Sequence, residues 1–270
     1  METGIATRRQ FLKGAGGATL GLVVVSGVGG LLASCTKNET PGATAAALPW
    51  PYKKIDPVAA AERGYAAYSE AGCMYGAFEG IIGELRASVG GPYETFPAKM
   101  MKYGRAGVVG WGTLCGVLNG AAAAAYLIHN SPEADPIVHE MYGWYGAEML
   151  PNYKPRNPKF QEIAATVSNS PLCHASVTTW CNASGFATHS PERGERCAWL
   201  TASTVKHLAE LLNQQAEGSF ALVHANPEEV AMCLSCHGNG GTVDNVHIDK
   251  QASCVICHDA EKHPIPLKQV

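Results

Sequence analysis

The chain has 270 residues, of which 46% are hydrophobic and 16% are charged, and its formal net charge at pH 7 is -3. This length and apolar content allow one large domain or two modest ones with a buried core. The slightly acidic balance argues against a nucleic-acid partner and suits docking on a basic redox protein.

The first 34 residues resemble an export leader. Residues 8–13 read Arg-Arg-Gln-Phe-Leu-Lys, which is similar to the twin-arginine motif, and a glycine-rich apolar run follows over residues 14–32. The run is about as long as a bilayer span, but its glycines make it weakly hydrophobic, which favours a cleaved leader over a permanent anchor. We therefore expect export by the twin-arginine route to the periplasm or the extracytoplasmic face of the membrane.

Cys35 offers a second signal near the N-terminus. The sequence Leu-Ala-Ser-Cys that ends at Cys35 resembles a lipobox, in which this cysteine becomes a lipidated N-terminus. Ordinary cleavage after Ala45 or Ala47 is the alternative. We expect residues 35–56 to form a polar tether, and lipidation of Cys35 would add a lipid anchor to the membrane.

Residues 57–215 carry helical signals almost throughout. Asp56 followed by Pro57 is a cap and first-turn pair that opens a helix to about Glu70. Residues 73–89 continue with apolar side chains at helical spacing. These patterns predict two consecutive helices at the start of the body.

More helices are predicted beyond a glycine-rich loop at residues 104–112. Small residues over 116–128 suit a tightly packed helix, and Ser-Pro-Glu sequences at Ser131 and Ser190 predict two helix starts. The second of these opens a long helix that ends near Gln215.

Strand-like alternation of period two is absent from the sequence over any useful length. We therefore predict a mostly α fold with two parts. The helical body, which contains scattered cysteines, covers residues 57–215, and a dihaem-binding segment of short helices and loops covers residues 216–270.

The C-terminal segment contains the sequence Cys-x-x-Cys-His twice, and this is the attachment signature of a c-type haem. Two thiols three positions apart can each bond one vinyl group of the porphyrin, while the next imidazole reaches the iron. We therefore predict two haem c groups. The predicted attachment residues are Cys233, Cys236, Cys254 and Cys257, and the predicted proximal iron ligands are His237 and His258.

A zinc ribbon is the main alternative, because the same four cysteines also fit its two ligand pairs. A four-thiolate zinc site has no use for the histidine that follows each pair. This histidine and the export leader favour haem.

Distal iron ligands are sought among the histidines that flank the motifs. The candidates are His224, His247 and His263, since bis-histidine ligation is typical of small multihaem cytochromes, although a lone histidine is as often a surface residue. Only 17 residues separate Cys236 from Cys254. So short a segment cannot enclose two porphyrins, and we expect closely spaced haems buried against the body or a second subunit.

Five cysteines remain in the helical body. Disulfides would be ordinary for an exported protein, but helical and apolar surroundings favour a four-thiolate iron-sulfur site with one spare cysteine. Export also favours the cluster, because haem is attached after translocation, whereas a cluster built in the cytoplasm needs folded ligands. The candidates are Cys73, Cys115, Cys173, Cys181 and Cys197.

These cysteines also carry a resemblance to known proteins. Cys73 on an apolar helix, the sequence Cys-Gly-Val-Leu-Asn-Gly at 115–120, Cys173 and Cys197 resemble the redox family named for its C-GCAxxG-C-C pattern. Such a domain followed by two Cys-x-x-Cys-His motifs resembles the split-Soret cytochromes c. The resemblance implies a dimeric periplasmic dihaem protein that also binds an iron-sulfur cluster, of the two-iron, two-sulfide (2Fe-2S) type.

The match implies Cys115, Cys173 and Cys197 as cluster ligands, completed by Cys73 or Cys181. Cys173 and Cys181 are eight residues apart. On one straight helix they would share a face two turns apart, which is too far for both to bind one iron. Sequence leaves the choice between Cys73 and Cys181 open.

We interpret the chain as an exported electron-transfer cytochrome, a homodimer that exchanges electrons with redox protein partners. An electron carrier is favoured over an enzyme, because no substrate pocket or acid-base constellation stands out. The chief alternative is a reductase in which one haem has an open site that binds an oxyanion or a nitrogen oxide. A zinc-bearing surface lipoprotein is the third interpretation, and it requires that haem be absent.

Overall fold

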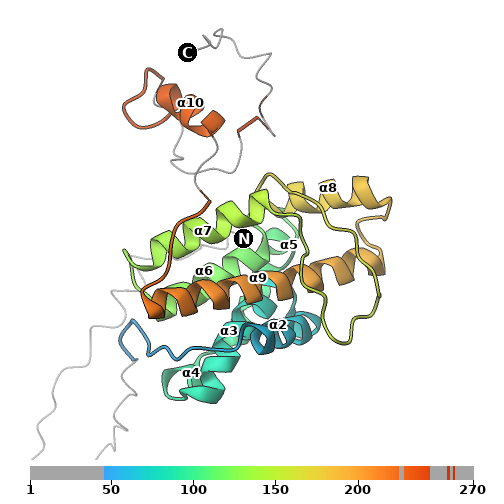
Figure 1. The fold of residues 1–270 in the computed structure, drawn as a ribbon. Coiled ribbons are helices and arrows are strands. Elements are labelled where there is room, and N and C mark those ends of the chain that lie inside the picture. The colour runs from blue at the N-terminus through green and yellow to red at the C-terminus, as the bar shows by residue number, and fades with distance from the viewer. Residues whose placement is uncertain (1–45, 225–227, 244–253, 256–257, 259–270) are drawn as a thin grey trace, which may run out of the picture. The chain divides into compact units, whose positions relative to one another are not determined.

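The computed structural model describes residues 46–224, 228–243, 254–255 and 258 (Figure 1). Several sequence predictions fall outside the described residues. These are the export leader, the lipidation candidate Cys35, the haem attachment residue Cys257 and the distal candidates His247 and His263.

The described part of the chain is mostly helical and contains no strand, which confirms the predicted fold class. Its only β-type pairings are isolated antiparallel bridges, Leu114 with Leu172 and Leu150 with Thr166. None of the described helices has the length and apolarity needed to cross a bilayer.

Helices α2 (Pro57–Ala71) and α3 (Cys73–Ser88) begin the body as the sequence predicts. The Asp56 carboxylate accepts hydrogen bonds from two amides of the first turn of α2, at 2.8 and 3.4 Å. Gly72, with φ of 89°, separates the two helices. A side chain would be strained in this backbone conformation, so the glycine permits the abrupt change of direction.

The chain then passes through α4 (Pro92–Thr95), the 3-10 helix η1 (Ala98–Gly104) and the short α5 (Arg105–Val108). Left-handed backbone at Ala106 and Gly107 turns the chain inside the predicted glycine-rich loop. This turn leads directly to the segment before α6.

Helix α6 (Gly116–Ile128) coincides with the predicted small-residue helix. Helix α7 (Ala134–Ala147) begins later than the pattern at Ser131 predicted. The Ser131 hydroxyl donates to the Asp135 carboxylate at 3.1 Å and caps no backbone amide. The predicted cap is therefore used in a side-chain contact, and the helix starts without it.

Helices α8 (Cys173–Ser184), α9 (Pro191–Glu217) and α10 (Glu228–His237) complete the described elements. Ser190 caps α9 as predicted, accepting a hydrogen bond from the amide three residues on at 3.2 Å. Gly218, with φ of 70°, ends this long helix.

Helix α3 lies at the centre of the body, where it packs against α2, α6 and α9, while α7 packs against α6 and α9 (Figure 1). The contact with α6 is close, because a Cβ atom on Gly120 would lie only 2.3 Å from the backbone oxygen of Met74. The absence of a side chain at Gly120 thus allows the backbones of α3 and α6 to approach each other.

The α3–α6 contact gives a stability prediction. Gly120→Ala should lower the free energy of unfolding by about 1–3 kcal/mol, because the added methyl group forces the two backbones apart. Gly194→Ala in α9 is the matched control, since a Cβ there meets no atom within 4 Å. It should be neutral or stabilise by up to about 1 kcal/mol. Urea unfolding followed by circular dichroism measures both, and equal stabilities would contradict the packing account.

Candidate metal centre

Four cysteines from different parts of the body meet at one place. Cys73 is the first residue of α3, and Cys115 immediately precedes α6. Cys173 is the first residue of α8, and Cys197 lies near the start of α9. The thiols of Cys115 and Cys173 are hydrogen-bonded, and the Cys73 thiol interacts with those of Cys115 and Cys197. We call this group the thiol cluster.

Backbone hydrogen bonds align the segments before α6 and α8. The amide of Cys115 donates to the carbonyl of Pro171 at 2.9 Å, and the amide of Cys173 donates to the carbonyl of Thr113 at 2.7 Å. An isolated antiparallel bridge lies between these two bonds. The pairing sets the starts of the two helices side by side and brings Cys115 next to Cys173.

Gly116 makes room for the Cys73 thiol. A Cβ atom at Gly116 would lie 2.4 Å from the Cys73 sulfur and 2.7 Å from the carbonyl oxygen of Gly104. Both distances are far below van der Waals contact, so the residue after Cys115 has to be glycine for Cys73 to reach the cluster. This requirement gives a physical reason for the Cys-Gly pair in the sequence.

The thiols change one another's ionisation. Burial and the neighbouring thiols of Cys115 and Cys197 raise the pKa of Cys73 to about 12. The hydrogen bond from Cys173 lowers the pKa of Cys115 to about 6 against the effect of burial, and the same bond raises the pKa of Cys173. A thiolate in this pair, the form that binds metals, is therefore stabilised by the thiol of the other cysteine.

The thiol cluster lies where three helices begin. Cys73 and Cys173 are first helical residues, and Cys115 is the cap residue of α6. The N-terminal end of a helix carries a partial positive charge and unpaired amides, both of which favour thiolates. The backbone alone therefore favours negative charge at this place.

Two arginines of α9 face the same thiols. Arg196 is only 1% exposed, and its Nη2 atom donates to the Ser176 hydroxyl at 2.8 Å, while its Nε atom has no hydrogen-bond partner. Arg193 lies one helical turn before Cys197. Burial lowers the pKa of both guanidinium groups, but neighbouring groups, with the Cys197 thiol foremost, together outweigh burial and raise it.

Cys181 stands apart from the thiol cluster. Helix α8 runs without a break from Cys173 to Ser184, so Cys181 lies about 12 Å further along the same helix. Cys181 is not among the main groups that shift the pKa of Cys73, Cys115 or Cys173. The structure thus completes the group with Cys73 and leaves Cys181 as the extra cysteine, a choice that sequence reasoning left open.

The thiol cluster does not have the geometry of a site for one ion. Among the described residues, no three His, Cys, Asp or Glu side chains stand in an arrangement fit to hold a single metal ion. Its four thiols nevertheless interact as one group, Cys173 with Cys115, Cys197 and Cys73, and Cys73 with Cys115 and Cys197.

The polar residues that surround the thiol cluster were not predicted from the sequence. Arg193 could have been found, because it lies four residues before Cys197 on a predicted helix. Arg196, Ser176 and Tyr145 could not, because their burial at the cluster depends on the packing of α7, α8 and α9.

The predicted haem-attachment residues that the structure describes lie in and after α10. Cys233 and Cys236 lie in its last turns and share a face at a spacing of three, with His237 as its last residue. In the second motif, the amide of His258 donates to the carbonyl of Cys254 at 3.1 Å, as in one helical turn. Both motifs therefore have helical local geometry where they are described.

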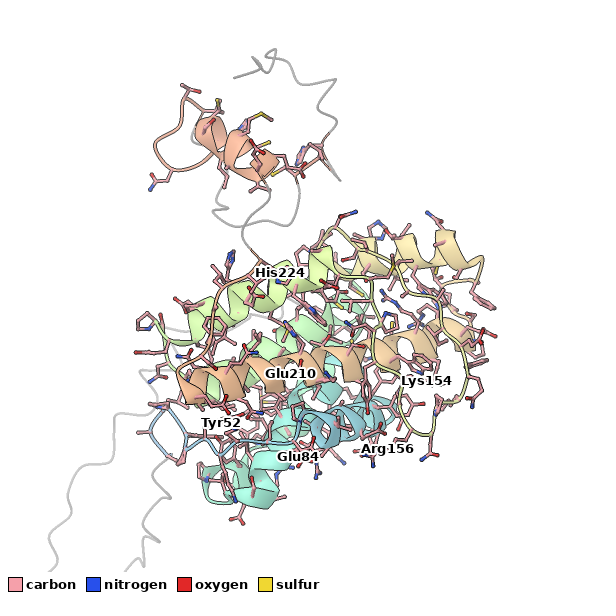
Figure 2. The ribbon with its side chains drawn as sticks, in the orientation of Figure 1. Tyr52, Glu84, Lys154, Arg156, Glu210 and His224 are labelled. Atoms are coloured by element: carbon pink, nitrogen blue, oxygen red, sulfur yellow. The ribbon has the colours of Figure 1, made fainter. Side chains whose placement is uncertain are left out.

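His224 is held against α7 by a buried carboxylate (Figure 2). Glu140, 2% exposed, accepts hydrogen bonds from the amides of Val223 and His224 at 2.7 and 2.8 Å. The His224 Nδ1 atom lies 2.6 Å from the other carboxylate oxygen. Burial raises the pKa of Glu140, but these hydrogen bonds outweigh it and lower the pKa. The ring is therefore fixed through Nδ1.

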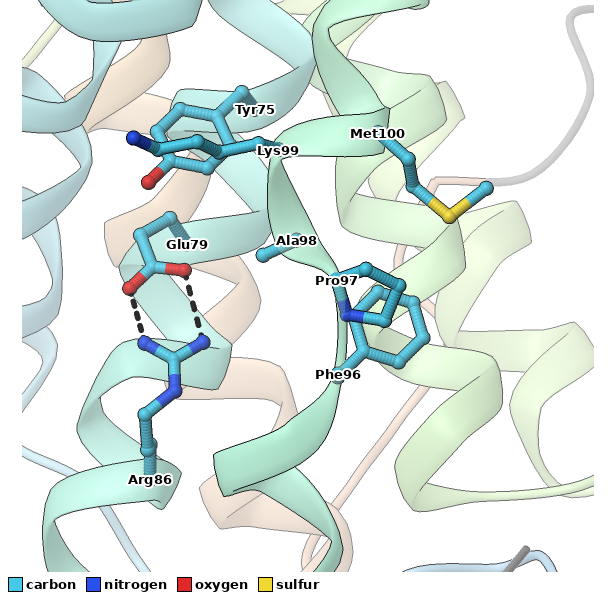
Figure 3. A pocket seen from close by; sticks show the side chains of 8 residues that line it. All are labelled: Tyr75, Glu79, Arg86, Phe96, Pro97, Ala98, Lys99 and Met100. Atoms are coloured by element: carbon cyan, nitrogen blue, oxygen red, sulfur yellow. Dashed lines mark hydrogen bonds and ion pairs between the residues drawn. The ribbon is translucent and has the colours of Figure 1, made fainter.

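A pocket of about 390 Å³ lies between α3 and η1 (Figure 3). Its acidic residue, Glu79, is bound to Arg86 by two hydrogen bonds of 2.5 and 3.1 Å. None of the predicted site residues lines this pocket. The carboxylate is neutralised by the arginine, so it is not a free acid or base for catalysis.

Comparison with known proteins first identifies the class of protein to which the helical body belongs. Residues 72–211 match the family described as putative redox-active protein (C_GCAxxG_C_C). This span includes all four residues of the thiol cluster. The helical body is therefore a redox domain of this class.

Two further comparisons extend beyond this domain. The chain is 31% identical over 263 residues to the split-Soret cytochrome c of Desulfovibrio desulfuricans (strain ATCC 27774 / DSM 6949 / MB), covering 93% of this chain and 94% of the relative. A solved structure that describes a novel iron centre in the split-Soret cytochrome c from Desulfovibrio desulfuricans ATCC 27774 matches with a TM-score of 0.71 and 32% identity. This structural match covers 75% of the present chain and 88% of the chain in the solved structure. The chain belongs to the split-Soret cytochrome c family, and its class is that of redox electron-transfer proteins.

The polar contacts of Arg196 give a second stability prediction. Ser176→Ala should lower the free energy of unfolding of the metal-free protein by about 1–3 kcal/mol. The change leaves a guanidinium N–H and the Tyr145 hydroxyl, now 2.8 Å from Ser176, buried without this partner. The exposed Ser69→Ala is the control and should change stability by less than about 0.5 kcal/mol. An equal effect of the two changes in thermal unfolding would show that the buried contact is unimportant.

Proposed function

We propose that this chain is an exported cytochrome in which each subunit holds two c-type haems and one iron-sulfur cluster and carries single electrons between redox proteins. The observation that carries the proposal is the convergence of four cysteines in a chain that also has two Cys-x-x-Cys-His motifs. The names of the related proteins, which mention a cytochrome c and an iron centre, support it.

The cluster ligands in this proposal are Cys73, Cys115, Cys173 and Cys197. Their chemistry fits an iron-sulfur cluster, because such clusters are held by thiolates and this site favours negative charge. When bound, the cluster supplies a centre that takes up and releases one electron. The chain's own residues hold it, exclude water by burial and place positive charge beside it.

The haem segment supplies covalent attachment and axial ligands. Thioether bonds from the two cysteines of each motif keep each porphyrin on the chain, and His237 and His258 bind the two irons. When bound, the haems supply two further one-electron centres. The short segment leaves the haems to be covered by other parts of the protein, which is our reason to propose a homodimer.

His224 is our preferred distal ligand among the described candidates. Its Nδ1 atom lies 2.6 Å from the Glu140 carboxylate, and its Nε2 atom, which is 3.9 Å from the Glu148 carboxylate and so beyond hydrogen-bond distance, is available to bind iron. A ligating histidine commonly donates its other ring nitrogen to a carboxylate in this way, since this fixes the tautomer and the ring orientation. The protein thereby holds one imidazole ready at the start of the haem segment.

Export by the twin-arginine route remains part of the proposal. Its support is the arginine pair at residues 8 and 9 and the need to fold the cluster ligands before translocation. Lipidation at Cys35 would place the protein at the membrane surface and cleavage after Ala45 or Ala47 would release it. Mass spectrometry of the mature N-terminus distinguishes the two.

Substitution of single cysteines tests the cluster ligands. Cys115→Ser and Cys197→Ser should each abolish the iron in excess of haem iron and the acid-labile sulfide, while covalent haem is retained. Cys181→Ser is the matched control on the same domain and should keep both. Iron and sulfide analysis of protein purified without oxygen measures this. Surplus iron that survives Cys115→Ser, or is lost only with Cys181→Ser, would contradict the ligand assignment.

Removal of His224 tests the distal ligand. His224→Ala should convert one of the two haems to a high-spin form that binds carbon monoxide, while the exposed His189→Ala should leave the visible spectrum unchanged. If both haems remain low-spin in His224→Ala, another residue supplies the distal ligand. Carbon monoxide binding by the unchanged protein would instead favour a reductase.

A further inference from the structure

Arg196 is a buried charge without a carboxylate partner in the part of the chain that the structure describes. It is 1% exposed, its Nη2 atom donates to neutral Ser176, and its Nε atom has no partner. The neighbouring Glu195 is also buried, but its carboxylate accepts hydrogen bonds from other groups. These donors are the Tyr65 hydroxyl, the Lys159 amide and the Trp199 indole.

An isolated buried guanidinium is unfavourable, because it has lost its hydration without gaining an opposite charge. The groups that face Arg196 are the thiols of Cys115 and Cys197 and the hydroxyls of Tyr145 and Ser176. None of these four groups is a carboxylate, and only the thiols belong to the cluster that is proposed to bind metal. The compensating negative charge must therefore come from the thiol cluster or from what it binds.

Arg193 places a second positive charge on the same side of α9. It lies one turn before Cys197 and interacts with the thiols of Cys197 and Cys173. Its Nε atom donates to the carbonyl of Thr188 at 2.6 Å, so part of this side chain is anchored at the surface. The helix starts at Cys73, Cys115 and Cys173 add partial positive charge from three other directions.

The negative charge of a thiolate-bound iron-sulfur cluster complements the positive charge around the thiol cluster. Four thiolates around an oxidised cluster of two or four irons leave two net negative charges, which two guanidinium groups balance. Uptake of one electron from a reduced c-type haem adds a third negative charge to the cluster and oxidises that haem iron from ferrous to ferric. Nearby positive charge stabilises the reduced cluster more than the oxidised one.

We infer that Arg196, assisted by Arg193, is the counter-charge of the four-thiolate centre and raises the potential at which this centre accepts an electron. This inference rests on the proposed function, because it needs a cluster on these four thiols. The effect of Arg196 exceeds that of Arg193, since the first guanidinium is fully buried and the second is partly screened by solvent.

The test is a redox titration of the intact haem-loaded protein, with the cluster followed by electron paramagnetic resonance and the haems by visible absorption. Arg196→Gln should lower the cluster potential, Arg193→Gln should lower it less, and Arg196→Lys should restore most of the loss. Arg63→Gln is the charge-matched control, because Arg63 is neutralised by Glu84 at 2.7 Å. It should leave the cluster potential unchanged.

Each outcome decides one of the two claims. A cluster potential that does not change in Arg196→Gln overturns the counter-charge inference while leaving the proposed function intact. Absence of any cluster signal in the unchanged protein overturns the proposed function itself. If Arg196→Gln does not fold, the cluster potentials of Arg193→Gln and Arg196→Lys test the inference in its place. A lower potential in Arg193→Gln supports the inference, and no change in that variant rejects it.

Discussion

The close contact between α3 and α6 determines where the cysteines lie. Gly116 and Gly120 of α6 have no room for a Cβ atom, because the Cys73 sulfur and the Met74 carbonyl oxygen occupy that space. The starts of the two helices are thereby held together, and Cys73 reaches Cys115. Paired backbone segments then add the start of α8, and α9 supplies the remaining thiol across the body. A domain whose core is helical thus assembles a site from residues far apart in sequence.

Electrostatics explains why this site suits an anionic metal centre. Three helix starts and two guanidinium groups converge on thiols of which those of Cys73 and Cys115 are buried and those of Cys173 and Cys197 are half-buried. In a low-dielectric interior such charges interact strongly, and an unpaired guanidinium is tolerated only beside negative charge. The same features that stabilise a cluster also set how readily it accepts an electron. Structure and redox function therefore depend on one arrangement of charges.

The features that were predicted correctly from the sequence depend on residues that are neighbours along the chain. The caps at Asp56 and Ser190 fix where α2 and α9 begin, and both helix starts were predicted. The helical spacing of apolar residues likewise indicated the helices themselves. Ser131 failed as a cap, because the Asp135 carboxylate takes its hydroxyl. The haem motifs are likewise local, since covalent attachment requires one fixed spacing.

Features that depend on the packing of distant elements were not accessible from sequence. The choice between Cys73 and Cys181 required the α3–α6 contact and an unbroken α8. The burial of Arg196 required α7, α8 and α9 to close around it, whereas arginine in a helix is usually an exposed residue. The contact between Glu140 and His224 joins residues 84 positions apart in the chain.

The central claim is that one chain carries both haem and an iron-sulfur cluster. Mössbauer spectroscopy of iron-enriched protein, purified without oxygen, tests it most directly because it distinguishes haem iron from cluster iron in one sample. We expect signals of two low-spin haem irons per chain together with antiferromagnetically coupled cluster iron. Haem iron alone, in protein with all four clustered cysteines intact, would contradict it.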